Sequence, residues 1–105
     1  MSIKIFESKL KATEAIPLGS IRKMIVKGRE YIITHTTGGF KVAEPLCPHR
    51  KEPLHKGKLN AFNELICPLH EYRFNLDTGA EASTKCPDLT LYQIVEKSDG
   101  LYLKI

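Results

Sequence analysis

Two short runs of this sequence, Cys47-Pro48-His49-Arg50 and Cys67-Pro68-Leu69-His70, are near-copies of each other. Each run offers one thiol and one imidazole, and each has a proline directly after its cysteine. Written as a pattern, the chain reads C-x-H, then a spacer of residues 50–66, then C-x-x-H. Sulfur and nitrogen donors of this kind are typical ligands of transition metals. The pair of runs therefore predicts a metal site built from two loops.

The spacing within each run fits this prediction. In an extended segment residues two apart share a face, so the side chains of Cys47 and His49 can point at one target. Cys67 and His70 are three apart and need a turn. Pro68 favours that turn, because it fixes its own φ and biases the preceding residue toward an extended backbone. Each loop can then present one sulfur and one nitrogen to a common point.

The two runs and the residues after them resemble the cluster loops of the Rieske [2Fe–2S] family, in which two cysteines hold one iron and two histidines hold the other. The first loop reads Cys47-Pro-His-Arg-x-x-Pro53-Leu54-x-x-Gly57. The second reads Cys67-Pro-Leu-His70-x-x-x-Phe74-x-x-x-Thr78-Gly79, and the continuous similarity covers roughly residues 45–80. The resemblance implies that one [2Fe–2S] cluster is bound by four side chains, Cys47, His49, Cys67 and His70.

The resemblance also indicates a branch of the family. The high-potential respiratory Rieske proteins carry a second cysteine in each loop, joined as a disulfide, where this chain has Glu52 and Leu69. That branch has a serine and a tyrosine two and four residues after the second histidine, where this chain has Tyr72 and Phe74. The closer match is the low-potential branch, which contains the soluble Rieske ferredoxins and the Rieske domains of ring-hydroxylating oxygenases. Many members have glycine directly after the second histidine, and this chain has Glu71.

A Rieske ferredoxin is an electron carrier and not an enzyme. Such proteins take single electrons from a flavin-dependent reductase and pass them to a terminal oxygenase, so the resemblance implies these redox partners and no small-molecule substrate. An oxygenase would need a further non-haem iron site, typically two histidines and a carboxylate. Only His35 and His55 remain unassigned. We expect His35 to be a half-exposed strand residue and His55 to be a solvated loop residue.

Two alternatives stay open. Two cysteines and two histidines would also satisfy a tetrahedral structural zinc ion, although C-x-H spacing is unusual for zinc fingers. Zinc would also leave the matches at Pro53, Phe74 and Thr78-Gly79 unexplained. The family further includes small subunits of assimilatory nitrite reductases, in which the Rieske-like chain is a fixed part of an enzyme. Many of those subunits have lost cluster ligands, and this chain retains all four, which favours a working redox centre.

Composition restricts the remaining functions. The chain has 105 residues, enough for one domain with a modest core. It carries 16 Lys and Arg against 12 Asp and Glu, a formal net charge of +4, without the aromatic-interleaved basic patch typical of nucleic-acid binding. No apolar run approaches about 18 residues, so we expect no membrane span, and the N-terminus shows no signal-peptide pattern. With two of the three cysteines assigned to metal, Cys86 has no disulfide partner, which favours a reducing, cytoplasmic location.

The rest of the chain predicts an all-β fold. Alternating and β-branched stretches predict strands over 3–6, 21–27, 31–37, 40–43, 72–76, 89–96 and 101–105. Residues 58–66 are expected to form two short strands around a turn, and this hairpin would bring the two metal loops together. Residues 9–14 and 80–87 are expected to be connectors, with no amphipathic helix. The prediction is a small antiparallel barrel or sandwich, one Rieske domain over 1–105 with a cluster-binding subdomain inserted at about 45–79.

The surroundings of the loops suggest three further roles. We expect Pro53 and Leu54 to cover the cluster and to exclude water from its sulfides. Cys86 is expected to be a small buried hydrophobe or an inert thiol. Five basic residues lie in or beside the loops, namely Arg50, Lys51, Lys56, Lys58 and Arg73. They form either a solvated surface or a docking rim for an acidic partner.

We predict a reduction potential below about 0 mV at neutral pH, in the lower part of the roughly −150 to +300 mV range of Rieske centres. Two neutral imidazoles in place of two thiolates change the formal charge of the oxidised cluster from −2 to 0 and raise its potential, whereas the missing disulfide and the missing hydroxyl at Phe74 keep it low. Redox titration followed by electron paramagnetic resonance measures it, and a value near about +300 mV would contradict the prediction. Phe74→Tyr is expected to raise the potential if its hydroxyl reaches a cysteine sulfur.

Overall fold

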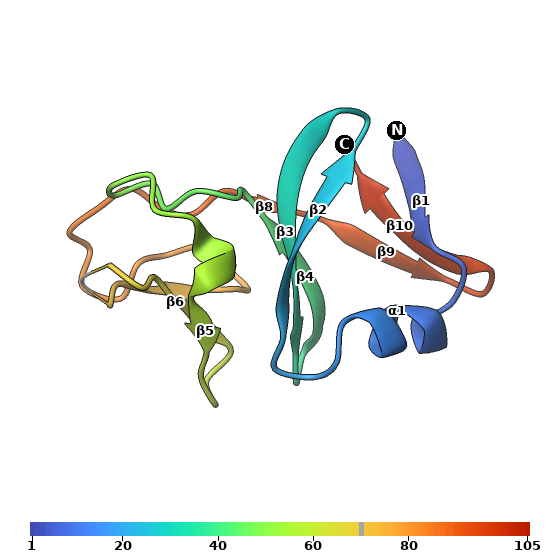
Figure 1. Cartoon of the computed structure of the whole chain (residues 1–105), viewed down its shortest axis with the longest axis horizontal. Helices are drawn as coiled ribbons and strands as arrows, with labels where there is room; N and C mark the ends of the chain where they lie inside the picture. The colour runs from blue at the N-terminus through green and yellow to red at the C-terminus, as the bar shows by residue number, and fades with distance from the viewer. Residues whose placement is uncertain (70) are drawn as a thin grey trace.

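The computed structural model describes residues 1–69 and 71–105, and it confirms an all-β fold (Figure 1). The strands of the body are β1 (Ser2–Phe6), β2 (Ile21–Val26), β3 (Arg29–Thr36), β4 (Gly39–Ala43), β8 (Leu91–Tyr92), β9 (Ile94–Lys97) and β10 (Gly100–Lys104). A second group of short strands comprises β5 (Lys58–Leu59), β6 (Glu64–Ile66) and β7 (Arg73–Asn75). Two short helices, α1 (Lys9–Ala15) and the 3₁₀ helix η1 (Leu54–Lys56), complete the described elements.

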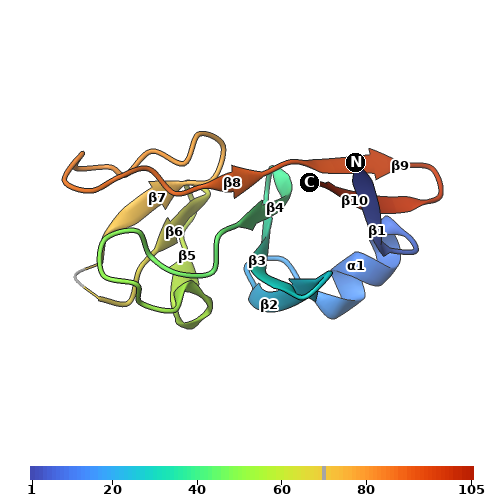
Figure 2. The same ribbon diagram turned by 90° about the horizontal axis from the view of Figure 1, so that it is seen from above.

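The strands form three small antiparallel sheets. The first has the order β1-β10-β9 and the second the order β2-β3-β4-β8, and together they make the body of the molecule. The third, β5-β6-β7, lies at the other end of the molecule, with both predicted metal loops (Figures 1 and 2). The predicted hairpin over 58–66 is confirmed, since Lys58 pairs with Ile66 and Leu59 with Leu65.

Strand β3 connects the two ends because its two faces belong to different cores. Successive side chains of a strand point to opposite faces. Tyr31 and Ile33 are therefore buried in the core of the body, with Val42 and Leu103. Ile32, which lies between them in sequence, is buried in the core that contains both cysteines of the predicted loops. The body thus provides a fixed platform for the metal loops.

The prediction of a connector over 9–14 is wrong, because residues 9–15 form helix α1. The Ser8 side chain caps the helix by accepting a hydrogen bond from the N–H of Lys11 at 3.1 Å. Ala12 and Ile16, four residues apart, are buried on the body core. Two apolar positions make too short a pattern to distinguish a helix from a loop. Within the described part of the chain, no helix has the length and apolar character needed to cross a membrane.

The predicted strand over 89–96 is divided between two sheets. Its first part, β8, pairs with β4, whereas its second part, β9, pairs with β10. The chain therefore passes from the second sheet to the first at Gln93. The predicted final hairpin is confirmed by the pairing of Lys97 with Gly100. The two ends of the chain meet beside it, since the Ile105 N–H donates to the Met1 carbonyl at 2.8 Å.

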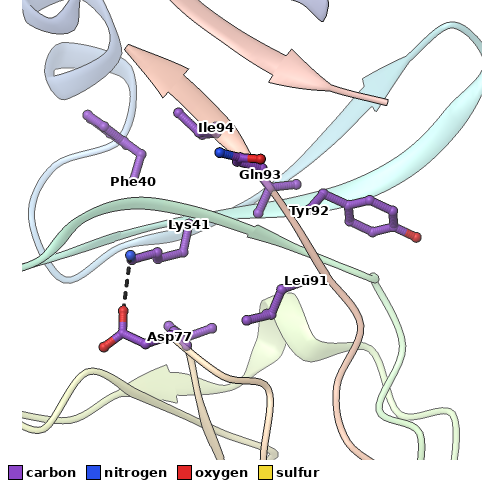
Figure 3. A pocket seen from close by; sticks show the side chains of 9 residues that line it. Phe40, Lys41, Asp77, Leu91, Tyr92, Gln93 and Ile94 are labelled. Atoms are coloured by element: carbon purple, nitrogen blue, oxygen red, sulfur yellow. Dashed lines mark ion pairs between the residues drawn. The ribbon is translucent and has the colours of Figure 1, made fainter. Parts of the chain in front are cut away.

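A hollow of about 340 Å³ marks the junction between the body and the metal loops (Figure 3). The Lys41 ammonium on β4 lies 3.0 Å from the Asp77 carboxylate, which belongs to the segment after β7. Leu76, Leu91 and Tyr92 are among the side chains that line the hollow. No cysteine or histidine is among its described lining residues. This hollow is therefore part of the junction and is separate from the predicted metal site.

Gly57 permits the two loops to approach each other, and its replacement provides a test. A Cβ atom at Gly57 would overlap the backbone carbonyl oxygen of Ile66 on β6. Gly57→Ala is therefore expected to destabilise the protein by about 1–3 kcal/mol, the usual cost of overpacking. Gly38→Ala is the control, because a Cβ there would lie 3.6 Å from the nearest atom, an ordinary contact. Thermal unfolding followed by circular dichroism measures both, and equal melting temperatures for the two variants would contradict the prediction.

Candidate metal centre

The two predicted loops close in the same way. The backbone N–H of Cys47 donates to the carbonyl of Glu52 at 2.8 Å, and that of Cys67 donates to the carbonyl of Tyr72 at 2.8 Å. In both loops the acceptor lies five residues after the cysteine. The bases of the loops are also paired alike, by the bridge between residues 46 and 53 and by the pairing of residue 66 with residue 73. The two near-copies in the sequence therefore fold as two copies of one loop.

The residue four positions after each cysteine adopts a left-handed backbone conformation. Its φ is 59° at Lys51 and 54° at Glu71. This conformation costs a residue other than glycine about 1–2 kcal/mol. Family members with glycine at the position of Glu71 avoid that cost. Glutamate here keeps the loop backbone and adds an exposed carboxylate beside the site.

The two thiols lie side by side inside the protein. Cys47 and Cys67 are both fully buried, in a core that also contains Leu54, Leu65 and Phe74. The pKa of Cys67 is raised to about 11, chiefly by burial and also by the neighbouring Cys47 thiol within hydrogen-bonding reach, whereas a backbone N–H at Leu69 opposes the shift. A Cys67 thiol with this pKa is protonated at neutral pH. A metal that binds here therefore has to displace the proton.

His49 contributes its ring from the first loop. The residue is half-buried, and its Nδ1 atom is buried. Its imidazole packs against the ring of Tyr72 from the second loop, with ring centroids 4.3 Å apart and ring planes tilted by 49°. The fourth predicted ligand, His70, lies outside the described residues. The structure thus brings the two cysteines together and places His49 in the same pair of loops.

The donors fit a two-iron cluster better than a single ion. A tetrahedral zinc ion needs four donors at one point, whereas a Rieske cluster holds cysteines and histidines at separate irons. Over residues 1–69 and 71–105, no three Cys, His, Asp or Glu side chains converge on one point suited to a metal ion. The thiols of Cys47 and Cys67 are paired, and His49 does not join them at one point.

The expected cover of the cluster is present in part. Leu54 is fully buried in the same core as both cysteines, and Pro53 is half-buried. Cys86 is half-buried against this core, and burial raises the pKa of its thiol. Its side chain thus packs as the sequence predicts, although it is not fully enclosed.

The other two histidines are not among the predicted ligands. His35 is half-buried on β3, where its Nδ1 donates to the Ile16 carbonyl at 2.8 Å and its ring stacks on Phe40 at 4.1 Å. It is a structural strand residue, as predicted. The prediction of a solvated loop for His55 is wrong, because His55 lies in the helix η1 and is half-buried.

Sequence reasoning missed the role of two residues near the loops. Tyr72 was noted only as a departure from the high-potential branch, and its contact with His49 could not be inferred from spacing. Glu81 is buried, and its carboxylate accepts hydrogen bonds from the hydroxyl of Ser83 and from the backbone N–H groups of Ser83 and Lys85. These bonds lower the pKa of Glu81 against the opposing effect of burial. They order the segment that follows the second loop, and a single glutamate two residues before a serine is too weak a sequence signal to predict this role.

The five basic side chains around the loops form an exposed group. Arg50, Lys51, Lys56, Lys58 and Arg73 are all exposed. None of the five forms an ion pair with a residue that the structure describes. On the body, Lys4, Lys9 and Lys23 each lie within 4.0 Å of a carboxylate oxygen, whereas Lys11 and Lys27 are in no ion pair with a described residue. The loop end of the molecule therefore presents five exposed basic side chains, with the exposed carboxylate of Glu71 among them.

Comparison with known proteins identifies the family. Residues 7–93 match the Rieske [2Fe-2S] domain family. The chain belongs to the Rieske [2Fe-2S] domain family. The cofactor class of this Rieske domain is accordingly a [2Fe–2S] cluster. This class agrees with the two adjacent thiols of Cys47 and Cys67 and with the position of His49 in the same pair of loops.

Two relatives illustrate the range of the family. The chain is 29% identical over 91 residues to the ferredoxin component of the naphthalene 1,2-dioxygenase/salicylate 5-hydroxylase systems of Ralstonia sp, with 86% of each chain covered. It is 33% identical over 58 residues to a human Rieske domain-containing protein, a match that covers 52% of this Rieske domain and 37% of the human protein. The chain thus spans well under half of the human relative.

Solved structures share the fold. The ferredoxin of carbazole 1,9a-dioxygenase from Nocardioides aromaticivorans superimposes with a TM-score of 0.80 at 22% identity, covering 98% of this chain and 96% of the other. A ferredoxin in complex with the oxygenase of carbazole 1,9a-dioxygenase gives a TM-score of 0.77 at 24% identity, with coverages of 97% and 91%. A protein assigned as the small subunit of an NADH-dependent nitrite reductase from Mycobacterium tuberculosis gives 0.79 at 11% identity, with coverages of 100% and 96%.

Proposed function

We propose that this Rieske domain is a one-electron carrier whose single cluster is held by Cys47 and Cys67 on one iron and by His49 and His70 on the other. The observation that carries the proposal is the matched pair of loops, which places two buried thiols side by side. The bound cluster supplies reversible one-electron chemistry. The chain itself needs no substrate site or catalytic residue for this role.

The protein residues have three tasks in this proposal. The four ligands hold the irons, and the hydrogen bonds that close the loops fix the cysteine backbones. Leu54, Leu65 and Phe74 form an apolar wall against the thiols and exclude water. Such an apolar environment, together with hydrogen bonds to the sulfurs, sets the potential of a cluster. We also propose that residues 1–105 form one domain with a cluster-binding subdomain at about 45–79, because β3 contributes to both cores.

We propose a flavin-dependent reductase as the electron donor and a terminal oxygenase as the acceptor. This is supported by the Ralstonia relative, a ferredoxin component of dioxygenase and hydroxylase systems, which the chain matches over 86% of its length. The nitrite reductase small subunit with the same fold supports the second candidate function, a fixed subunit of a reductase. Size-exclusion chromatography of the native protein from its source distinguishes the two, since a carrier elutes alone and a subunit elutes with its enzyme. A cytoplasmic location stays a prediction that rests on the free cysteines.

We predict that Cys47→Ser, His49→Ala, Cys67→Ser and His70→Ala each abolish or severely impair the cluster. Each change removes one of four protein–iron bonds, and no spare ligand lies at the right spacing. Iron and acid-labile sulfide per chain measure the loss, and a full, normal cluster in any of the four variants would refute the assignment. His35→Gln and Cys86→Ser are controls and are expected to leave the optical spectrum unchanged. A colourless wild type with bound zinc would instead establish the zinc alternative.

We predict that the exposed basic residues accelerate docking of an acidic partner. The double variant Arg50→Glu/Lys56→Glu is expected to slow electron transfer by about tenfold, the lower end of electrostatic steering effects, with the potential unchanged. Lys11→Glu/Lys27→Glu is the matched control, because it alters the net charge equally on exposed residues of α1 and of the β2–β3 turn. Stopped-flow transfer to an authentic protein partner measures the rates.

Salt provides an independent check of the same docking prediction. Redox complexes of this kind are small and transient, so charge acts mainly on the rate of encounter. Higher ionic strength is expected to slow transfer by the wild type, because it screens the attraction. The Arg50/Lys56 double variant should depend less on salt than the wild type does. Rates that respond neither to salt nor to charge reversal would remove the electrostatic account of docking.

A further inference from the structure

Tyr72 makes contacts with both loops. Its backbone belongs to the second loop, where its carbonyl accepts the hydrogen bond from the N–H of Cys67 at 2.8 Å. Its ring packs on the imidazole of His49 from the first loop, at 4.3 Å between centroids. The side chain is half-buried and lies against the core that contains both cysteines. One residue is thus fixed by its backbone to one cysteine and by its ring to a histidine of the other loop.

This contact limits how the imidazole can turn. The two rings are tilted by 49° to each other and are too close for either to rotate freely. A histidine that holds an iron through one nitrogen can otherwise rotate about that bond and about its side-chain torsions. The loop hydrogen bond holds the Tyr72 backbone, and the Tyr72 side chain packs against the core that contains both cysteines, so its ring restricts the rotation of His49. Groups that orient a metal-bound histidine in this way are part of the working site, although they do not touch the metal.

The same ring keeps water from one side of His49. His49 is only half-buried, and its Nδ1 edge is already enclosed. A smaller side chain at position 72 would open the histidine side of the site to solvent. By formal charge the oxidised cluster is neutral and the reduced cluster carries one negative charge. Water beside the site stabilises the charged state more, so solvent entry raises the potential.

We propose that Tyr72 is a positioning residue of this centre: its ring sets the orientation of the His49 imidazole and shields the histidine-held iron from water. The inference rests on the proposed function, since it requires His49 to be a ligand. If the inference is correct, the Tyr72 ring affects both the reduction potential and the lifetime of the cluster. The contact is made by the aromatic ring, so phenylalanine at position 72 is expected to preserve this role. An aliphatic side chain at the same position is expected to lose it.

The test compares Tyr72→Leu with Tyr72→Phe in the cluster-loaded protein. Tyr72→Leu is expected to change the nitrogen hyperfine couplings of a ligand histidine, measured by electron–nuclear double resonance, and to shift the potential upward. It is also expected to shorten the lifetime of the oxidised cluster in excess chelator by roughly two- to tenfold, the factor that corresponds to losing one aromatic contact. Tyr72→Phe is expected to keep the wild-type couplings, potential and lifetime. Tyr72→Met, which fills the space without a ring, gives the same comparison if Tyr72→Leu does not fold.

A matched control separates positioning from general loss of stability. Tyr92 is also half-buried and makes an aromatic contact, with Tyr31 at 5.0 Å and 89°, in the body of the molecule. Tyr92→Leu is expected to lower the melting temperature and to leave the nitrogen couplings and the potential at their wild-type values. A merely structural role for Tyr72 would give this same result.

The outcomes separate the inference from the proposed function. A wild type without a histidine-ligated [2Fe–2S] spectrum would overturn the proposed function itself. With that spectrum present, unchanged couplings and potential in Tyr72→Leu, or in Tyr72→Met, would overturn the positioning role. Couplings in Tyr72→Phe that change as much as those in Tyr72→Leu would show that the hydroxyl and not the ring is responsible, and would also overturn it. Changes in the aliphatic variants together with rescue by phenylalanine establish it.

Discussion

The structure of this Rieske domain depends on one repeated hydrogen bond, from a cysteine N–H to the carbonyl five residues later. It closes each loop, and the left-handed residue before the acceptor makes the closure possible at both Lys51 and Glu71. Because both loops close alike, the thiols of Cys47 and Cys67 meet inside the protein. The backbone at Gly57 has no room for a Cβ atom, because the loops must approach this closely.

The body of the molecule and the loops have different roles. The body contributes a core of its own and a platform, through β3, whose Ile32 faces the cysteines while Ile33 faces away from them. The loops contribute the two cysteine thiols, and the apolar side chains around these thiols exclude water from them. A buried thiol such as Cys67 resists ionisation without a metal, so formation of the site and binding of the cofactor are coupled.

Much of this arrangement could be predicted from the sequence, because it depends on local signals. Residues 31–37 are rich in β-branched residues and are followed by Gly38-Gly39, so the β3–β4 hairpin could be predicted from the sequence. The helix at Lys9–Ala15 could not be predicted, because only Ala12 and Ile16 are buried in the core and two apolar positions do not define a helical pattern. The division at Gln93 of the predicted strand over 89–96 could not be predicted from the sequence either. Nothing local distinguishes a strand that pairs with one sheet from a strand that changes sheets.

The spacing of Cys47, His49, Cys67 and His70 was enough to predict a donor set and its order along the chain, because two short loops can use these spacings. Only the tertiary structure decided how the loops face each other. It places the ring of Tyr72 on His49, 23 positions away in sequence, and buries Leu54 in the same core as Cys67. Spacing along a chain is set by covalent geometry and can be read directly. Contacts between separate loops depend on how both pack against a shared core, which no short stretch of sequence contains.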